Sequence, residues 1–228
     1  MARRGTPLRR KPELRAPRRK FILLTEGKNT EPDYFRAIRS HFRGALIEIE
    51  LVPAVGTPMT IANQAVQRKR DLRRGARGAS WQLADEVWAV FDRDEHPNVE
   101  AAINLCRGAG VGVAFSNPCF ELWLILHHED FGRLDDRHAV QKHFATLCES
   151  YDPGGAKRPD CAPLMAQIEA AEARAEQQHK QRLAEGDEFG RPMTTVSLLT
   201  AAIRAAATSG ISVMEIPSAQ YYLSCLTY

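Results

Sequence analysis

The 228-residue sequence predicts an α/β fold in which a mostly parallel, four-stranded sheet is flanked by helices and followed by a helical C-terminal extension. Four short apolar runs, at 20–25, 46–52, 87–91 and 111–115, have the length and composition of strands. Segments with apolar residues three or four positions apart, typical of helices, separate these runs. Strands that alternate with helices in this way usually pair in parallel.

Start and stop residues place the helices. Asn29 and Thr30 are capping residues, and Glu31 and Pro32 follow in the first turn, so a helix is expected from there to about Phe42. Glycines and prolines between the apolar stretches mark the loops. The other helices are expected at 56–77, 97–108, 120–126, 136–147, 162–184 and 195–207.

Composition divides the chain into four segments. Residues 1–19 form a basic arm expected to be disordered, 20–130 an α/β core, 131–210 a helical extension packed on that core, and 211–228 a tail without an assigned role. Five cysteines without paired spacing predict neither a zinc site nor a disulfide framework. No apolar run reaches the length of a membrane span and no signal peptide is evident, so a cytoplasmic protein is expected.

Two aspartates, Asp92 and Asp94, follow the third predicted strand. In an open parallel sheet, ligands bind just beyond the carboxyl ends of the strands. Residues two apart on a strand point to the same side, so both carboxylates can reach one hard cation such as Mg²⁺. Asp is also favoured at helix caps and in turns, so a purely structural role is the alternative.

Glu26 ends the first predicted strand in the same way. If the two strands are neighbours, Glu26, Asp92 and Asp94 line one edge of the sheet, where their mutual repulsion favours a bound Mg²⁺ or Mn²⁺. Glu121 lies in the apolar run 120–126, where a carboxylate needs a partner such as a metal or a basic residue. These four carboxylates are the candidate catalytic residues, and the first three are the candidate metal ligands.

Four phrases of this sequence resemble the RloB-like proteins and, more broadly, the Toprim domain. They are Leu24–Phe35, Val90–Asp94, Ser116–Leu124 and Arg191–Val196, and together they cover about residues 20–208. The last phrase departs from the Asn-Pro-Ser-Thr pattern of that family, which leaves the roles of Thr194 and Thr195 open. The resemblance implies a Toprim-like (Rossmann-like) fold related to OLD-type nucleases, and it supports Glu121 as a site residue.

Basic residues are concentrated at the N-terminus and at the end of the second predicted helix. Such residues can bind phosphate backbones. The arm could equally be a solvated tail, and cations near a helix C-terminus also stabilise the helix. The candidate nucleic-acid-binding residues are Arg3, Arg4, Arg9, Arg10, Lys11, Arg18, Arg19, Lys28, Arg68, Lys69, Arg73 and Arg74.

His127 follows the short apolar run 120–126. A histidine here can transfer a proton, since its ordinary pKa lies close to neutral. Its charge can equally interact with the negative C-terminal end of a helix. His127 is therefore a candidate for proton transfer with a structural alternative.

The preferred function is metal-dependent hydrolysis of phosphodiester bonds in nucleic acid, RNA or DNA. The resemblance implies a bacterial anti-phage or restriction-linked defence setting, and a co-encoded defence or restriction-modification protein is a candidate partner. By analogy with other small Toprim defence effectors, tRNA is a candidate substrate. The chain is too short for the further domains of a primase or a topoisomerase, and an oligomer is left open.

Two other functions are consistent with the same residues. The first is a non-catalytic module that binds nucleic acid or a partner protein. The second is a Mg²⁺-dependent nucleotide phosphotransferase or hydrolase, although the segment Glu26–Asn29 lacks the spacing of a phosphate-binding loop.

Overall fold

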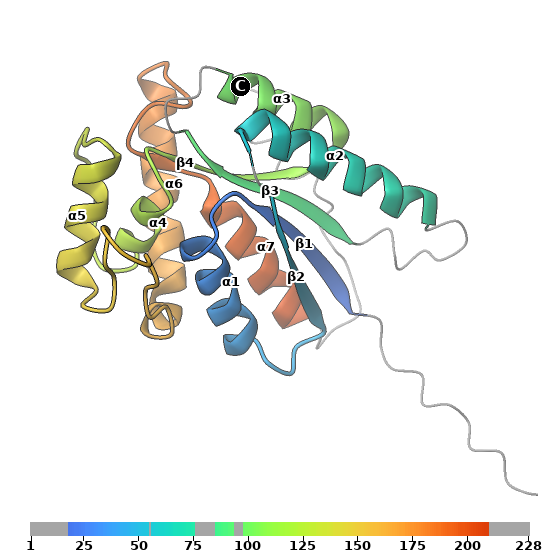
Figure 1. The fold of residues 1–228 in the computed structure, drawn as a ribbon, viewed down its shortest axis with the longest axis horizontal. Helices are drawn as coiled ribbons and strands as arrows, with labels where there is room; N and C mark the ends of the chain where they lie inside the picture. The colour runs from blue at the N-terminus through green and yellow to red at the C-terminus, as the bar shows by residue number, and fades with distance from the viewer. Residues whose placement is uncertain (1–17, 55, 76–84, 94–97, 210–228) are drawn as a thin grey trace, which may run out of the picture.

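A five-stranded sheet in the order β2-β1-β3-β4-β5 forms the centre of the fold (Figure 1). The structure, a computed structural model, describes residues 18–54, 56–75, 85–93 and 98–209. The prediction of four parallel strands is confirmed. They are β1 (Arg19–Thr25), β2 (Ile47–Pro53), β3 (Glu86–Asp92) and β4 (Gly112–Asn117).

The fifth strand corrects the prediction of a four-stranded sheet. β5 (Met193–Thr194) runs antiparallel to β4. The Thr194 hydroxyl lies 3.0 Å from the Ser116 hydroxyl, and the Thr195 hydroxyl accepts a 2.9 Å hydrogen bond from the Phe115 N–H. Two residues are too few to show the alternation that identifies a strand in a sequence. Thr194 and Thr195 thus attach this segment to the sheet.

Seven α-helices surround the sheet in the described part of the chain. Asp136 caps α5, as predicted, by accepting a 2.8 Å hydrogen bond from the Ala139 N–H. The predicted helix at 162–184 is divided, because a 3-10 helix, η2 (Pro163–Gln167), precedes α6. The helices are α1 (Thr30–His41), α2 (Pro58–Gly75), α3 (Val99–Ala109), α4 (Glu121–Ile125), α5 (Arg137–Leu147), α6 (Ile168–Ala184) and α7 (Val196–Ser209).

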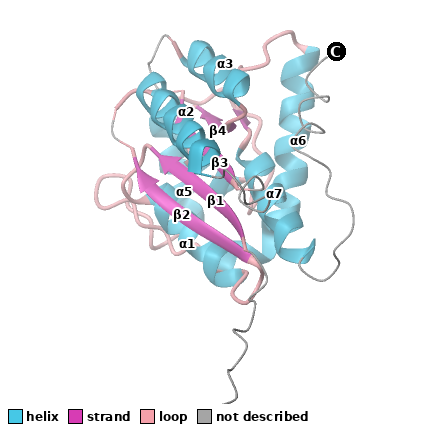
Figure 2. Ribbon diagram, turned by 90° about the vertical axis from the view of Figure 1, so that its right-hand side faces the viewer, coloured by secondary structure: helices cyan, strands magenta, loops and turns pink. Residues whose placement is uncertain are grey.

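Helices cover both faces of the sheet (Figure 1 and Figure 2). Alternate residues of the strands pack on opposite sides, as the pleat requires. Ile22, Leu24 and Phe91 face the layer formed by α2 and α3. Phe21, Leu23 and Val90 face the layer that contains α1, α4 and α7. Both faces are therefore filled with apolar side chains, which leaves the strand ends as the place for polar chemistry.

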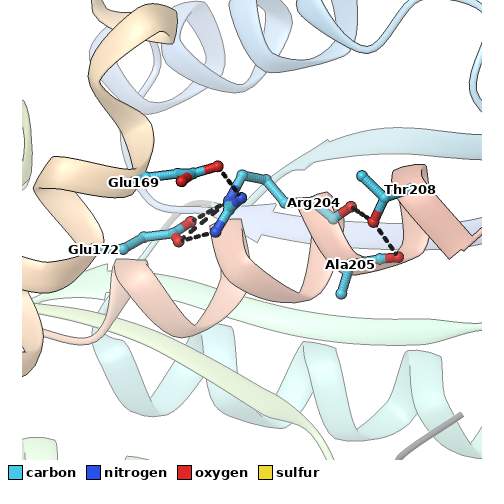
Figure 3. A network of polar contacts seen from close by, with 5 residues as sticks. All are labelled: Glu169, Glu172, Arg204, Ala205 and Thr208. Atoms are coloured by element: carbon cyan, nitrogen blue, oxygen red, sulfur yellow. Dashed lines mark hydrogen bonds and ion pairs between the residues drawn. The ribbon is translucent and has the colours of Figure 1, made fainter.

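A charged network joins α6 to α7 (Figure 3). The Arg204 guanidinium, in α7, lies 2.6 Å from a Glu169 carboxylate oxygen and 2.8 Å from Glu172, both in α6. The Thr208 hydroxyl donates to the Arg204 carbonyl at 3.0 Å, within α7. Pairing of one guanidinium with two carboxylates fixes the orientation of the two helices.

A search for membrane-spanning helices within the described ranges finds none of sufficient length and apolarity. The predicted arm up to residue 17 and the tail from residue 211 lie outside these ranges.

Gly112 pairs with Trp88 where β4 begins. A Cβ atom at Gly112 would lie 2.3 Å from the Trp88 ring, whereas one at Gly108, in α3, would meet nothing within 4 Å. We expect Gly112→Ala to lower the free energy of unfolding by about 1–3 kcal/mol, because the ring must shift in a packed layer. Gly108→Ala should raise it by up to about 1 kcal/mol. Urea unfolding measures both changes, and equal stability of the two variants would contradict the packing of β3 against β4.

Candidate functional site

The strand order places the site between β1 and β3. From β1 the chain crosses to β2 on one side and later to β3 on the other, so the direction of winding reverses there. Ligands of open α/β sheets bind at such switch points, beyond the carboxyl ends of the strands. Glu26 follows β1, and Asp92 is the last residue of β3. The Glu26 N–H donates to the Val90 carbonyl at 3.2 Å, so the two strand ends lie side by side, as predicted.

Glu31 is a buried carboxylate beside this edge, with 6% of its surface exposed. Its Oε1 accepts a 3.2 Å hydrogen bond from the Gly27 N–H, which holds it over the turn between β1 and α1. Burial, followed by the negative charges of Glu121 and Glu26, raises the pKa of Glu31 to about 7. Glu31 is thus a member of the site that the sequence interpretation assigned only to the first turn of a helix.

Glu121 reaches the same region from the start of α4, and 4% of its surface is exposed. Its Oε1 accepts a 2.5 Å hydrogen bond from the Tyr151 hydroxyl, a neutral partner in place of the metal or basic residue that the sequence interpretation expected. Burial, and then the charges of Glu121 and Asp92, raise the pKa of the Cys119 thiol. Glu121 and Asp92 therefore act on one buried group. We refer to Glu26, Glu31, Asp92 and Glu121 as the carboxylate cluster.

The carboxylate cluster offers oxygen ligands, which hard divalent cations prefer. Its members repel one another, and a bound cation relieves this repulsion. Among residues 18–54, 56–75, 85–93 and 98–209, however, no three His, Cys, Asp or Glu side chains are arranged so that they could hold a metal ion. The third predicted ligand, Asp94, lies outside the described residues. The described carboxylates thus fit Mg²⁺ in chemistry and charge but do not by themselves form a complete site.

His127 is a core residue, with 2% of its surface exposed. One ring nitrogen, Nδ1, lies 2.9 Å from the Trp123 carbonyl oxygen, and Nε2 lies 3.1 Å from the Tyr34 hydroxyl. Burial lowers the pKa of His127 to about 4, so the ring is neutral at pH 7. Both nitrogens have partners within the core, which favours a structural role over proton transfer, although as a neutral core residue and not as the charged partner of a helix end.

Most of the predicted phosphate-binding residues that the structure describes do not lie at the carboxyl ends of the strands, where the carboxylate cluster is. They lie toward the amino-terminal ends. Arg19 pairs with Glu86 at the start of β3, and the Lys69 ammonium donates to the Asp85 carbonyl at 3.0 Å. Arg68 lies 2.9 Å from Glu50, the middle residue of β2, and is therefore about half-way along the strands. A seven-residue strand separates the amino-terminal ends from the carboxylate cluster by about 20 Å. Arg18, Arg73 and Arg74 belong to the same end, whereas Lys28 lies beside the cluster, and Arg3, Arg4, Arg9, Arg10 and Lys11 lie outside the described residues.

The raised pKa of Glu31 predicts an unusual pH dependence of stability. Folded Glu31, with a pKa of about 7 against an ordinary 4.5, holds its proton more tightly than the unfolded chain does. Its contribution to stability is therefore complete below pH 4.5 and is lost as the pH rises to about 7. Glu31→Gln removes the charge and keeps an acceptor for Gly27. We expect this variant to match the wild type at pH 4.5 and to exceed its free energy of unfolding by up to about 3 kcal/mol at pH 8.

Chemical denaturation in EDTA at the two pH values measures this difference. Glu100→Gln is the matched control, because Glu100 also lies in the first turn of a helix but is exposed. A Glu31→Gln variant that is less stable than the wild type at pH 8 would contradict the placement of Glu31 among like charges.

Comparison with known proteins agrees with the resemblance of the four sequence phrases. The family model described as RloB-like protein matches residues 21–203, which includes every strand but the first two residues of β1. No curated protein and no solved structure matches the chain significantly. The family match covers well over half of the sequence, and the chain therefore belongs to the RloB-like protein family.

Proposed function

We propose that this protein is a metal-dependent nuclease with a Toprim-like fold, which hydrolyses phosphodiester bonds in RNA or DNA. The observation that supports this proposal is the convergence of carboxylates from four elements at the β1/β3 switch point. Hydrolysis of a phosphodiester places negative charge on the phosphorus oxygens and on the leaving group, which a carboxylate-bound cation can stabilise. A structural capping role accounts for one aspartate, but not for a buried glutamate, Glu31, whose pKa is raised by burial and by the charges of Glu121 and Glu26.

Glu26, Asp92 and Asp94 are the residues that would hold Mg²⁺ or Mn²⁺. When bound, the ion supplies the positive charge that neutralises the reacting phosphate. Glu26 either completes the ligand set or acts as a general acid or base. Glu121 is oriented by its hydrogen bond from Tyr151, and Glu31 by its bond from Gly27, so both carboxylates hold fixed positions beside the reaction site.

The biological setting that we propose follows from the family. RloB-like proteins resemble components encoded beside restriction-modification and other anti-phage systems, so a role in bacterial defence is proposed. A co-encoded defence protein is the proposed partner, and structured RNA such as tRNA is the first substrate to test by analogy with other small Toprim effectors.

Cleavage assays test the nuclease directly. We expect the purified protein to cut labelled single-stranded DNA, duplex DNA or total tRNA in Mg²⁺ or Mn²⁺, and not in EDTA. Glu26→Gln and Asp92→Asn should each lower the rate by a factor on the order of 100 or more, roughly the contribution of one positioned catalytic group.

Glu176→Gln is the control, since Glu176 is an exposed carboxylate in α6 that pairs with Lys180 of the same helix. Full activity in Asp92→Asn would show that any observed cleavage comes from elsewhere and would contradict the proposal.

A non-catalytic nucleic-acid-binding module is the second candidate. It is favoured by the finding that the described side chains form no arrangement of three possible metal ligands. Binding of the same polymers in EDTA and Mg²⁺ alike, with no cleavage in either, would support this second function over the first.

A further inference from the structure

The loop of residues 151–160, which connects α5 to η2, is fastened across the turn between β1 and α1. The Asn29 amide donates to the Ala156 carbonyl at 2.7 Å, and the Thr30 hydroxyl donates to the Lys157 carbonyl at 3.1 Å. At its start, Tyr151 donates to Glu121 of the carboxylate cluster. We call residues 151–160 the strap. It is therefore attached both to the turn that carries Glu26 and to the cluster itself.

The strap brings two basic side chains, Lys157 and Arg158, to the border of the carboxylate cluster. Arg158 lies close to Asn29, with 3.4 Å between its Nη2 and Oδ1, and Lys28 precedes Asn29 in the same turn. Lys28 and Arg158 are both exposed, and Lys157 is half-buried. In the described part of the chain, none of these three cations forms an ion pair with a carboxylate, whereas Arg19 pairs with Glu86 at the start of β3 and Arg68 with Glu50 in the middle of β2.

The aspartates of the strap form no ion pair with these three cations in the described residues, and both instead accept hydrogen bonds from backbone N–H groups. Asp152 accepts a 2.9 Å hydrogen bond from the Gly154 N–H. Asp160 accepts one of 3.1 Å from the Ala162 N–H. The strap thus uses its carboxylates to fix its own shape and leaves its basic side chains available for an external anion.

Lys157 has a backbone conformation that lysine seldom adopts. Its φ angle is +47°, in the left-handed region, and it is the only non-glycine residue with positive φ among those the structure describes. Its N–H donates to the Asp152 carbonyl at 3.3 Å, and its ammonium group donates to the Gln141 side chain at 3.2 Å. Glycine or asparagine usually occupies such a position. Residues held in this region by surrounding contacts are concentrated at functional sites.

We propose that Lys28, Lys157 and Arg158 form the surface that binds the phosphate backbone of the substrate next to the carboxylate cluster. The cluster repels a polyanion, so cations at its border are required to hold the strand within reach. This inference rests on the proposed function and names the part of the site that positions the nucleic acid. It replaces the basic end of α2, which is about 20 Å away along the strands, as the principal contact.

Binding without turnover tests the proposal. The anisotropy of a fluorescein-labelled single-stranded oligoribonucleotide is titrated in EDTA over a series of KCl concentrations. Two lost phosphate contacts lower the salt slope by about 1.4, so Lys28→Ala/Arg158→Ala should bind roughly 10- to 30-fold more weakly near 0.1 M salt. Arg39→Ala/Arg43→Ala, which removes two exposed cations at the far end of α1, should bind like the wild type.

A second variant separates a binding role from a structural one. Lys157→Gly suits the left-handed backbone and removes the charge, so we expect weaker binding with no loss of melting temperature. Equal affinity and salt slope in Lys28→Ala/Arg158→Ala and in the Arg39→Ala/Arg43→Ala control would overturn the proposal. A wild type that does not bind the oligonucleotide would also overturn it. A wild type that binds but does not cut in Mg²⁺ would contradict the proposed nuclease activity. In that case weaker binding by Lys28→Ala/Arg158→Ala would still support this binding surface.

Discussion

Repulsion among buried carboxylates at one edge of the sheet is the constraint on which the site depends. Glu31 shows it most clearly, since burial and two neighbouring glutamates raise its pKa to about 7. Such an arrangement costs stability at neutral pH, and it persists only because the surrounding fold holds it in place. Apolar side chains fill both faces of the sheet, and hydrogen bonds from Gly27 and Tyr151 orient two of the acidic groups.

The charged side chains of the described residues are distributed differently along the strands. Away from the carboxyl ends of the strands, Arg19 and Arg68 each pair with a glutamate, as in an ordinary protein surface. At the carboxyl ends, acidic groups gather below an attached loop whose cations have no carboxylate partner in the described residues. The acidic side chains and the cations of this loop lie near each other but form no ion pairs with each other in the described residues. This separation suits a site in which the cations bind phosphate and the carboxylates bind a cation.

Much of this architecture could be predicted from the sequence. Apolar runs of strand length that end in Glu26 and Asp92 identified both neighbouring strands and the edge that carries the carboxylates. Glu121 could be selected because a carboxylate in an apolar run requires a partner, and Tyr151 is that partner. The strand predictions are confirmed, because they depend on local composition and on the rules of parallel sheets, whereas the roles of the site residues stay predictions.

Other features depend on contacts between distant segments, which periodicity does not reveal. The sequence shows Glu31 only as a residue in the first turn of a helix. The fold shows that it is buried close to Glu121. The two residues of β5 are too few for a pattern, and the strap meets the β1 turn across more than 120 positions of sequence. The sequence shows that the end of α2 is basic, which is why it was predicted as a phosphate contact. It does not show at which end of the strands that helix finishes.

Mn²⁺ binding to the metal-free protein tests the assignment of the carboxylates most directly. Electron paramagnetic resonance of free Mn²⁺ during a titration measures binding without any need for a substrate. We expect the wild type and Glu176→Gln to bind the ion and Asp92→Asn to lose most of that binding while its circular dichroism spectrum is unchanged. A folded wild type that leaves Mn²⁺ free, or an Asp92→Asn variant that binds it equally well, would contradict a metal site at the β1/β3 edge.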